Sequence, residues 1–164
     1  MRKQIIGGEV VGHEPSAGGI ASAKWLDLDA VASVEVSSED PEFPIEEALG
    51  SHPESKLERG WRAAGPGPQT IRLRFDSPQH IQRIFIRFID RKQERGQEFL
   101  LRYTASGRTG DIVRQQWSFS PGGSTEELED YAVDLPGVAV LELQIDPDRG
   151  AGKAVAVLSE FHLA

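Results

Sequence analysis

The sequence contains no cysteine, no asparagine and a single methionine among its 164 residues. Without cysteine the chain has no disulfide framework, no thiolate metal site and no cysteine nucleophile. The absence of asparagine excludes an N-glycosylation sequon. No eighteen apolar residues run together, so we expect no membrane-spanning helix. Residues 1–8 start with basic side chains but contain no apolar run of signal-peptide length, and we therefore expect a cytoplasmic protein.

Positive charge is also scarce, because 26 acidic residues against 18 Lys and Arg give a net charge of −8. A nucleic-acid binder needs a basic surface that displaces phosphate counterions, so we expect no nucleic-acid partner. Basic residues do gather locally, at Arg83, Arg87, Arg91, Lys92 and Arg95. An alternating basic strand followed by a basic loop is more typical of a solvated face, and an anion site is the less favoured alternative.

Apolar and polar residues alternate through most of the chain after residue 31, which is the pattern of half-buried strands. Short Pro and Gly turn signals separate these segments. The expected strands are residues 31–38, 70–76, 81–89, 99–103, 112–119, 131–135, 138–145 and 155–163. The single expected helical turn is Pro44–Leu49, which ends at Gly50. About eight strands with almost no helix predict an all-β fold, with two antiparallel sheets packed face to face.

Residues 1–30 differ from the rest in being rich in Gly and Ala. We expect them to form an N-terminal extension or an added edge strand, and a partly ordered tail is the alternative. Residues 31–164 suit one domain.

The common catalytic signatures are missing. No serine stands in a Gly-x-Ser-x-Gly context, and the four histidines are not at metal-ligand spacing. Residues 150–153 lack the flanking residues of a phosphate loop, so we interpret them as a surface hairpin loop. The acidic run at 126–130 is interpreted as a solvated, solubilising segment. We therefore expect no enzyme, although a glycosidase carboxylate pair can also come from distant positions.

The order of the motifs resembles the discoidin-type, galactose-binding-like domains, a group that includes the coagulation factor V/VIII C-type domains and many bacterial carbohydrate-binding modules. The resemblance covers residues 31–164. The matching segments are Ala32–Ser38, Pro44–Gly50, Gly60–Arg62, Ile71–Phe75 with Pro78, Ile81–Ile86, Gln97–Tyr103 and Leu158–Phe161. The resemblance implies a jelly-roll β-sandwich of about eight antiparallel strands.

Members of this family typically bind through loops at one end of the sandwich and are not enzymes. The resemblance therefore implies a non-catalytic binding module for a carbohydrate or another small polar ligand. Sugar sites combine an aromatic platform with planar polar groups that bond hydroxyls. The candidate loop residues are Glu39, Asp40, Phe43, His52, Arg62, Arg91 and Arg95, with Trp117 and Phe119 as further platforms. Trp61 matches a family tryptophan that packs the turn against the body, so we favour a core role for it.

Many family members carry a structural calcium at an Asp-Gly-Asp-type turn, completed by a Glu in the last strand. Here Leu49 and Ser51 stand where the acids would be. Calcium takes six to eight oxygen ligands. The side chains that could contribute to a structural calcium site are Glu47, Ser51, Glu54 and Glu160.

The missing acids favour a second hypothesis. On this hypothesis the chain is a protein-interaction or assembly module that has kept the sandwich and lost the sugar site, and its partner is a protein. It predicts an exposed apolar patch or a subunit interface.

Overall fold

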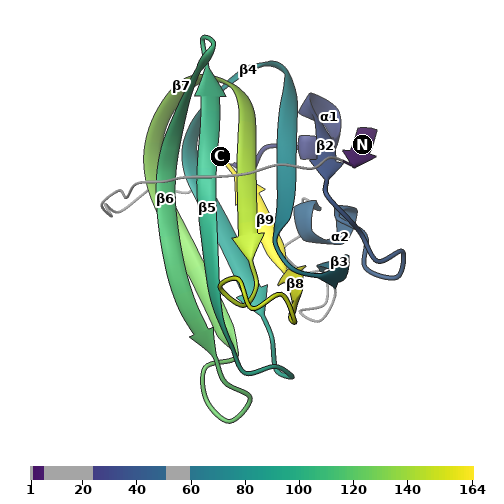
Figure 1. Ribbon diagram of the computed structural model, residues 1–164. Coiled ribbons are helices and arrows are strands. Elements are labelled where there is room, and N and C mark those ends of the chain that lie inside the picture. Colours follow the sequence, from purple (N-terminus) through teal and green to yellow (C-terminus); the bar gives the residue numbers. More distant parts are fainter. Residues whose placement is uncertain (1, 6–23, 51–59) are drawn as a thin grey trace.

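The computed structural model describes residues 2–5, 24–50 and 60–164, and strands dominate these ranges (Figure 1). The all-β fold class is confirmed. No helix in these ranges is long and apolar enough to cross a membrane. In chain order the elements are β1 (Arg2–Ile5), α1 (Leu28–Val31), β2 (Ala32–Val36), α2 (Glu46–Leu49), β3 (Trp61–Pro66), β4 (Gln69–Ile89), β5 (Arg95–Ala105), β6 (Arg108–Phe119), β7 (Glu126–Asp146), β8 (Val155–Leu158) and β9 (Glu160–Leu163).

Two long strands, β4 and β7, span the length of the sandwich. Each has 21 residues, and they pair antiparallel (Figure 1). The sequence pattern predicts each as two separate strands, with Pro136-Gly137 as a stop, and this prediction is wrong. The pairing continues through register shifts between Arg74 and Arg83. Such irregularities bend a strand without ending it, and Gly137 accommodates the bend with a φ of +70°.

The bend in β4 and β7 divides the structure into two layers. Residues 69–74 of β4 pair with β7 and β2, and this layer continues through β5 and β6. Residues 81–89 belong to the second layer, where β4 pairs with the first half of β7 and with β9. The inward faces of both layers form one core, which includes Val34, Ile71, Leu73, Ile84, Ile86, Phe88, Phe99, Leu101, Leu141, Leu143 and Phe161. The predicted jelly-roll sandwich is thus the observed architecture.

The N-terminal residues Arg2–Ile5 add a strand at the edge of the first layer, where β1 runs parallel to β2. The Lys3 ammonium lies 2.7 Å from a carboxylate oxygen of Glu39 and 2.9 Å from one of Glu46. The sequence pattern does not predict helix α1. Leu28 is the one buried residue of this short helix, so the segment has no repeated apolar spacing that would indicate a helix.

The expected final strand is in fact two strands, β8 and β9, interrupted at Ser159. The Ser159 amide donates to the Arg87 carbonyl oxygen at 2.8 Å, which attaches this break to β4. The strand β8 pairs with β3 in a separate two-stranded ladder. Gly60, just before β3, packs against the same break.

We predict that Gly60→Ala lowers the free energy of unfolding by about 2–3 kcal/mol, because overpacking forces the backbone to shift. An added Cβ would lie 2.3 Å from the Leu158 carbonyl oxygen and 2.8 Å from the Ser159 Cα, neither of which is a flexible side chain. Urea denaturation measures the change. The matched control is Gly65→Ala on β3, where an added Cβ meets no atom within 4 Å. Equal stability of the two variants would contradict the prediction.

Candidate functional site

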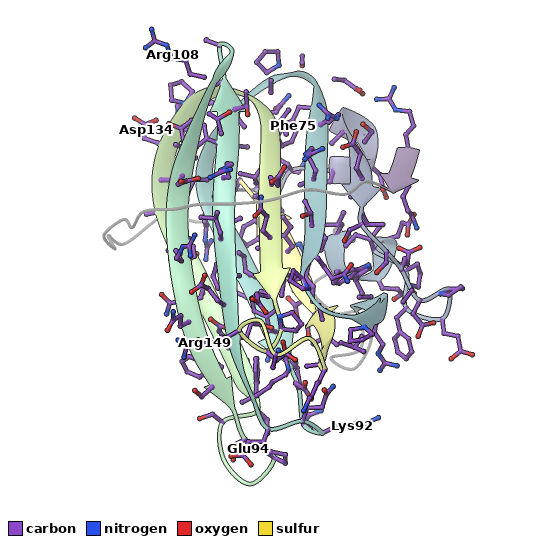
Figure 2. All side chains as sticks on the ribbon, viewed as in Figure 1. Phe75, Lys92, Glu94, Arg108, Asp134 and Arg149 are labelled. Carbon is purple, nitrogen blue, oxygen red and sulfur yellow. The ribbon has the colours of Figure 1, made fainter. Side chains whose placement is uncertain are left out.

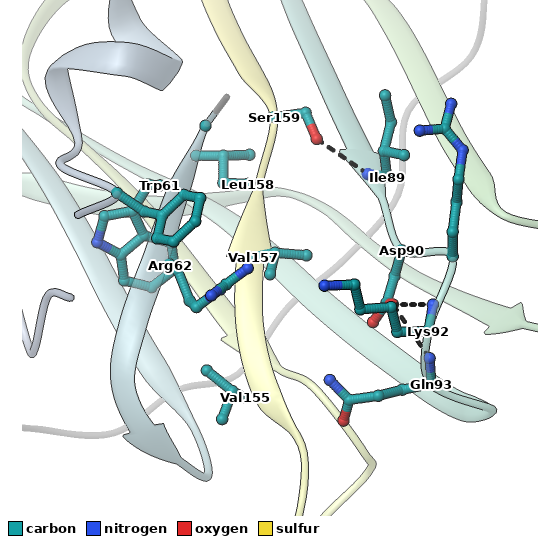
Figure 3. A pocket seen from close by; sticks show the side chains of 13 residues that line it. Trp61, Arg62, Ile89, Asp90, Lys92, Gln93, Val155, Val157, Leu158 and Ser159 are labelled. Carbon is teal, nitrogen blue, oxygen red and sulfur yellow. Dashed lines mark hydrogen bonds between the residues drawn. The ribbon is translucent and has the colours of Figure 1, made fainter. Parts of the chain in front are cut away.

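A pocket of about 560 Å³ opens between the β3·β8 ladder and the turn that joins β4 to β5. The turn lies at the end of the sandwich opposite Arg108 and Asp134 (Figure 2). The pocket is lined by Phe43, Gly60, Trp61, Arg62, Ile89, Asp90, Arg91, Lys92, Gln93, Val155, Val157, Leu158 and Ser159 (Figure 3).

Strand pairing gives the pocket an apolar floor. In the β3·β8 ladder Trp61 stands opposite Leu158, and Arg62 stands opposite Val157. Side chains alternate between the faces of a strand. Trp61 and Leu158 therefore lie in the core, 1% and 0% exposed, and the predicted core role of Trp61 is confirmed. The half-buried Val155 and Val157 face the pocket instead.

Arg62 and Phe43 form one wall of the pocket. The guanidinium carbon of Arg62 lies over the Phe43 ring, 3.9 Å from its centroid. This contact is a cation–π interaction, which positions both side chains. The Asp40 carboxylate lies 3.9 Å from the same guanidinium, beyond hydrogen-bond distance. The N–H groups of Arg62 are therefore not hydrogen-bonded to Asp40.

The opposite wall is the β4–β5 turn, and the Asp90 carboxylate organises it. One Asp90 oxygen accepts hydrogen bonds from the backbone amides of Lys92 and Gln93, at 3.0 and 3.2 Å. The Asp90 amide donates to the Thr125 carbonyl oxygen at 2.9 Å. With the backbone fixed in this way, the Lys92 and Gln93 side chains extend across the pocket toward β8 (Figure 3).

Arg95 supports this turn from inside the protein. The prediction that it lies on a loop is wrong, because it begins strand β5 and its side chain is 2% exposed. Its Nε donates to Asp90 at 2.8 Å, and its Nη1 donates to the Gln97 side chain and to the Pro147 carbonyl oxygen, both at 2.8 Å. A buried charge requires such partners. Arg95 therefore positions the turn and does not face the pocket.

Glu127 extends the same buried network, and this corrects the interpretation of the acidic run as solvated. The Glu127 side chain is 0% exposed, and its Oε2 accepts a hydrogen bond from the Gln97 amide at 3.2 Å. Burial raises the pKa of the Glu127 carboxyl to about 8, and the nearby charge of Glu129 adds to the rise. The alternation of β7 turns Glu127 inward and leaves Leu128 outward, 48% exposed.

The lining of the pocket is basic, although the protein carries a net charge of −8. Among the described lining residues three side chains are cationic, those of Arg62, Arg91 and Lys92. Within that described part of the lining the acidic side chain is Asp90, whose charge is balanced by the buried Arg95. The pocket therefore presents apolar surface and positive charge together.

The predicted ligand residues divide into three groups. Phe43, Arg62 and Arg91 line the pocket, with Asp40 beside Arg62. Glu39 instead supports helix α2, where its carboxylate accepts a hydrogen bond from the Ile45 amide at 2.8 Å. His52 lies outside the described residues.

The other two candidate platforms, Trp117 and Phe119, do not line the pocket. Trp117 is partly buried against the core, and Phe119 is 1% exposed beneath the Arg95 guanidinium. Sequence reasoning missed Lys92, Gln93, Val155 and Val157. The alternation of residues 155–158 signals a strand, but which face is buried depends on the pairing with β3.

The predicted calcium set lies only partly within the described residues. Ser51 and Glu54 lie outside the described residues. The Glu160 carboxylate lies 3.2 Å from Arg87 Nη1 and 3.5 Å from His162 Nε2, so both of its oxygens face nitrogen groups. Glu47 lies in α2, and within the described ranges no three acidic or histidine side chains are grouped to hold a metal.

A scan against protein-family models finds no match, and neither does a search of curated proteins. Solved structures do match. The family 32 carbohydrate-binding module of C. perfringens NanJ, in complex with galactose, has a TM-score of 0.58 and 14% identity, over 85% of this chain and 97% of that one. A pectin-binding carbohydrate-binding module has a TM-score of 0.55 and 17% identity, over 81% of this chain and 89% of that one. The family 32 module of AlyQ, in complex with 4,5-unsaturated mannuronic acid, has a TM-score of 0.51 and 15% identity, over 82% of this chain and 95% of that one.

At these identities the likeness establishes the fold. The chain has the galactose-binding-like β-sandwich fold of these modules, which is the fold that the resemblance in sequence implies.

The raised pKa of Glu127 predicts a specific pH dependence of stability. Between about pH 4.5 and 8 the folded protein holds a proton that an unfolded glutamate has released. The stability that the fold gains from keeping the Glu127 carboxyl protonated is complete below pH 4.5 and is lost as the pH rises through 8. The side chain of Glu127→Gln stays neutral at every pH. From pH 5 to 9 the free energy of unfolding of this variant should therefore rise by roughly 2–4 kcal/mol relative to that of the natural protein.

Urea denaturation across this pH range measures the difference between the two proteins. The matched control is Glu126→Gln, on the opposite, exposed face of the same strand. A stability difference for Glu127→Gln that does not change with pH would show that the carboxyl is ionised in the fold.

Proposed function

We propose that this chain is a non-catalytic binding module that takes a carbohydrate in the pocket between the β3·β8 ladder and the β4–β5 turn. The observation that carries the proposal is the combination of an apolar floor with polar side chains on two walls. A volume of about 560 Å³ falls within the usual range for small-molecule sites.

Each part of the pocket suits one property of a sugar. A pyranose ring has an apolar face of C–H groups, and Val155, Val157 and Phe43 offer a matching surface. Its hydroxyls need donors and acceptors in planar groups. The Arg62 guanidinium and the Gln93 amide supply these groups from opposite walls (Figure 3). The carbohydrate-binding modules of the same fold, one of them in complex with galactose, support this assignment.

The lining supports binding without catalysis. Hydrolysis of a glycosidic bond typically uses two carboxyl groups on either side of the bond. Among the described lining residues Asp90 is the one carboxylate, and it already binds Arg95 and two backbone amides. It is therefore held as a structural group.

The surface gives less support to the protein-interaction alternative. That hypothesis predicts an exposed apolar patch, and stable partner surfaces usually have one. In the part of the chain that the structure describes, Leu128 is the one large apolar side chain that is exposed. The pocket is thus the feature on which the proposal rests.

A titration with a panel of neutral and acidic monosaccharides and disaccharides, followed by NMR, tests the proposal. We expect at least one sugar to bind with a millimolar or tighter dissociation constant. Val157→Phe should weaken that binding at least tenfold, because the larger ring fills the floor while an aromatic residue still suits a strand. Thr109→Phe, exposed on β6, is the control. Absence of binding to the whole panel, or binding unchanged by Val157→Phe, would refute the proposal.

A further inference from the structure

We infer that the preferred ligand of this pocket is an acidic sugar, a pyranose that carries a carboxylate, bound as an ion pair with Lys92 and Arg62. The inference rests on the proposed function, because it names the class of sugar for the same site.

The charges around the pocket carry the inference. Three arginines of the basic segment, residues 83–95, have acidic partners: Arg83 lies 2.7 Å from Asp130, Arg87 lies 2.8 Å from Glu126, and Arg95 lies 2.8 Å from Asp90. Lys92 differs, since no carboxylate of the described residues lies within 4.0 Å of its ammonium. The charges of Arg83, Arg87 and Arg95 are therefore balanced by nearby carboxylates. The charge of Lys92, at the pocket, is not balanced by a carboxylate of the described residues.

Asp90 does not cancel this charge. It lines the pocket, but its carboxylate is hydrogen-bonded to the buried Arg95 and to the Lys92 and Gln93 amides. With this pair balanced, the positive charge of Lys92 remains at the pocket beside that of Arg62, which Asp40 opposes at 3.9 Å. An anionic ligand offsets this repulsion, whereas a neutral sugar leaves it in place.

Arg62 is placed to receive a carboxylate. Its guanidinium lies over the Phe43 ring, so one face of the group is covered. The N–H donors of a guanidinium lie in its plane and match the two oxygens of a carboxylate. Stacking on Phe43 leaves these donors at the edge, and Lys92 extends from the opposite wall (Figure 3).

The floor argues for a sugar acid over a small inorganic anion. Val155 and Val157 lie beneath the cationic groups, and both are half-buried apolar side chains. Phosphate or sulfate has no apolar surface to cover them. A uronic acid has both a carboxylate for the walls and an apolar ring face for the floor.

Calorimetric titration with matched sugar pairs tests this inference. The pairs are galactose with galacturonate, glucose with glucuronate and mannose with mannuronate, and acetate and phosphate serve as simple anions. At 50 mM NaCl we expect at least one uronate to bind about tenfold more tightly than its neutral partner, the effect of one charge-assisted hydrogen bond. At 500 mM NaCl the ratio should fall to about threefold, because salt screens exposed charges.

Lys92→Gln is the decisive variant. It should lower the ratio of uronate affinity to neutral-sugar affinity about fivefold, because the ion pair is made by the uronate alone. Arg108→Gln removes an exposed charge at the far end of the sandwich and is the matched control (Figure 2).

The outcomes separate this inference from the proposed function. If neutral sugars bind and no uronate binds more tightly, the inference fails while the proposed function stands. If no sugar binds, both fail. If acetate or phosphate binds as tightly as the uronates, the pocket is a simple anion site and the inference is overturned.

Discussion

The continuous antiparallel pairing of β4 with β7 organises the whole sandwich. Because these strands bend instead of ending, one pair of strands supplies both layers of the sandwich. Every other strand of the main sheet is attached to this pair directly or through one neighbour. The end of β4 also leads into the turn that forms a wall of the pocket, so the position of that wall follows from the same pairing.

A buried polar network supports that wall. Asp90 orders the turn, Arg95 balances Asp90, and Gln97 connects Arg95 to Glu127. Loss of one partner from such a network leaves the other charge buried and unpaired, which costs about 3–5 kcal/mol. The network therefore explains why charged residues lie inside the protein beside the pocket. On the pocket side of the turn, the Lys92 ammonium has no carboxylate of the described residues within 4.0 Å.

Much of the fold was predictable, because strand periodicity is a local property of the sequence. The alternation of Ile71, Leu73 and Phe75 is such a signal. The errors have non-local causes: Pro136-Gly137 resembles a turn until its pairing partner is known, and Glu127 resembles a solvated carboxylate until β7 is paired.

The candidate site was predictable in part for the same reason. Phe43, Arg62 and Arg91 could be selected as loop candidates of suitable chemistry, and they line the pocket. The floor could not be selected, because the outward face of Val155 and Val157 is set by pairing with β3. Likewise, Arg95 is buried because its partners include Pro147, which is distant in sequence.

We propose that a sugar binds between β8 and the β4–β5 turn. Mapping of amide chemical shifts by NMR during titration with the three uronates tests it most directly. We expect the largest shifts on Arg62, Lys92, Gln93 and Val157, with little change near Arg108 and Asp134 at the opposite end (Figure 2). Largest shifts at that opposite end, or on the outer face of β6, would contradict it.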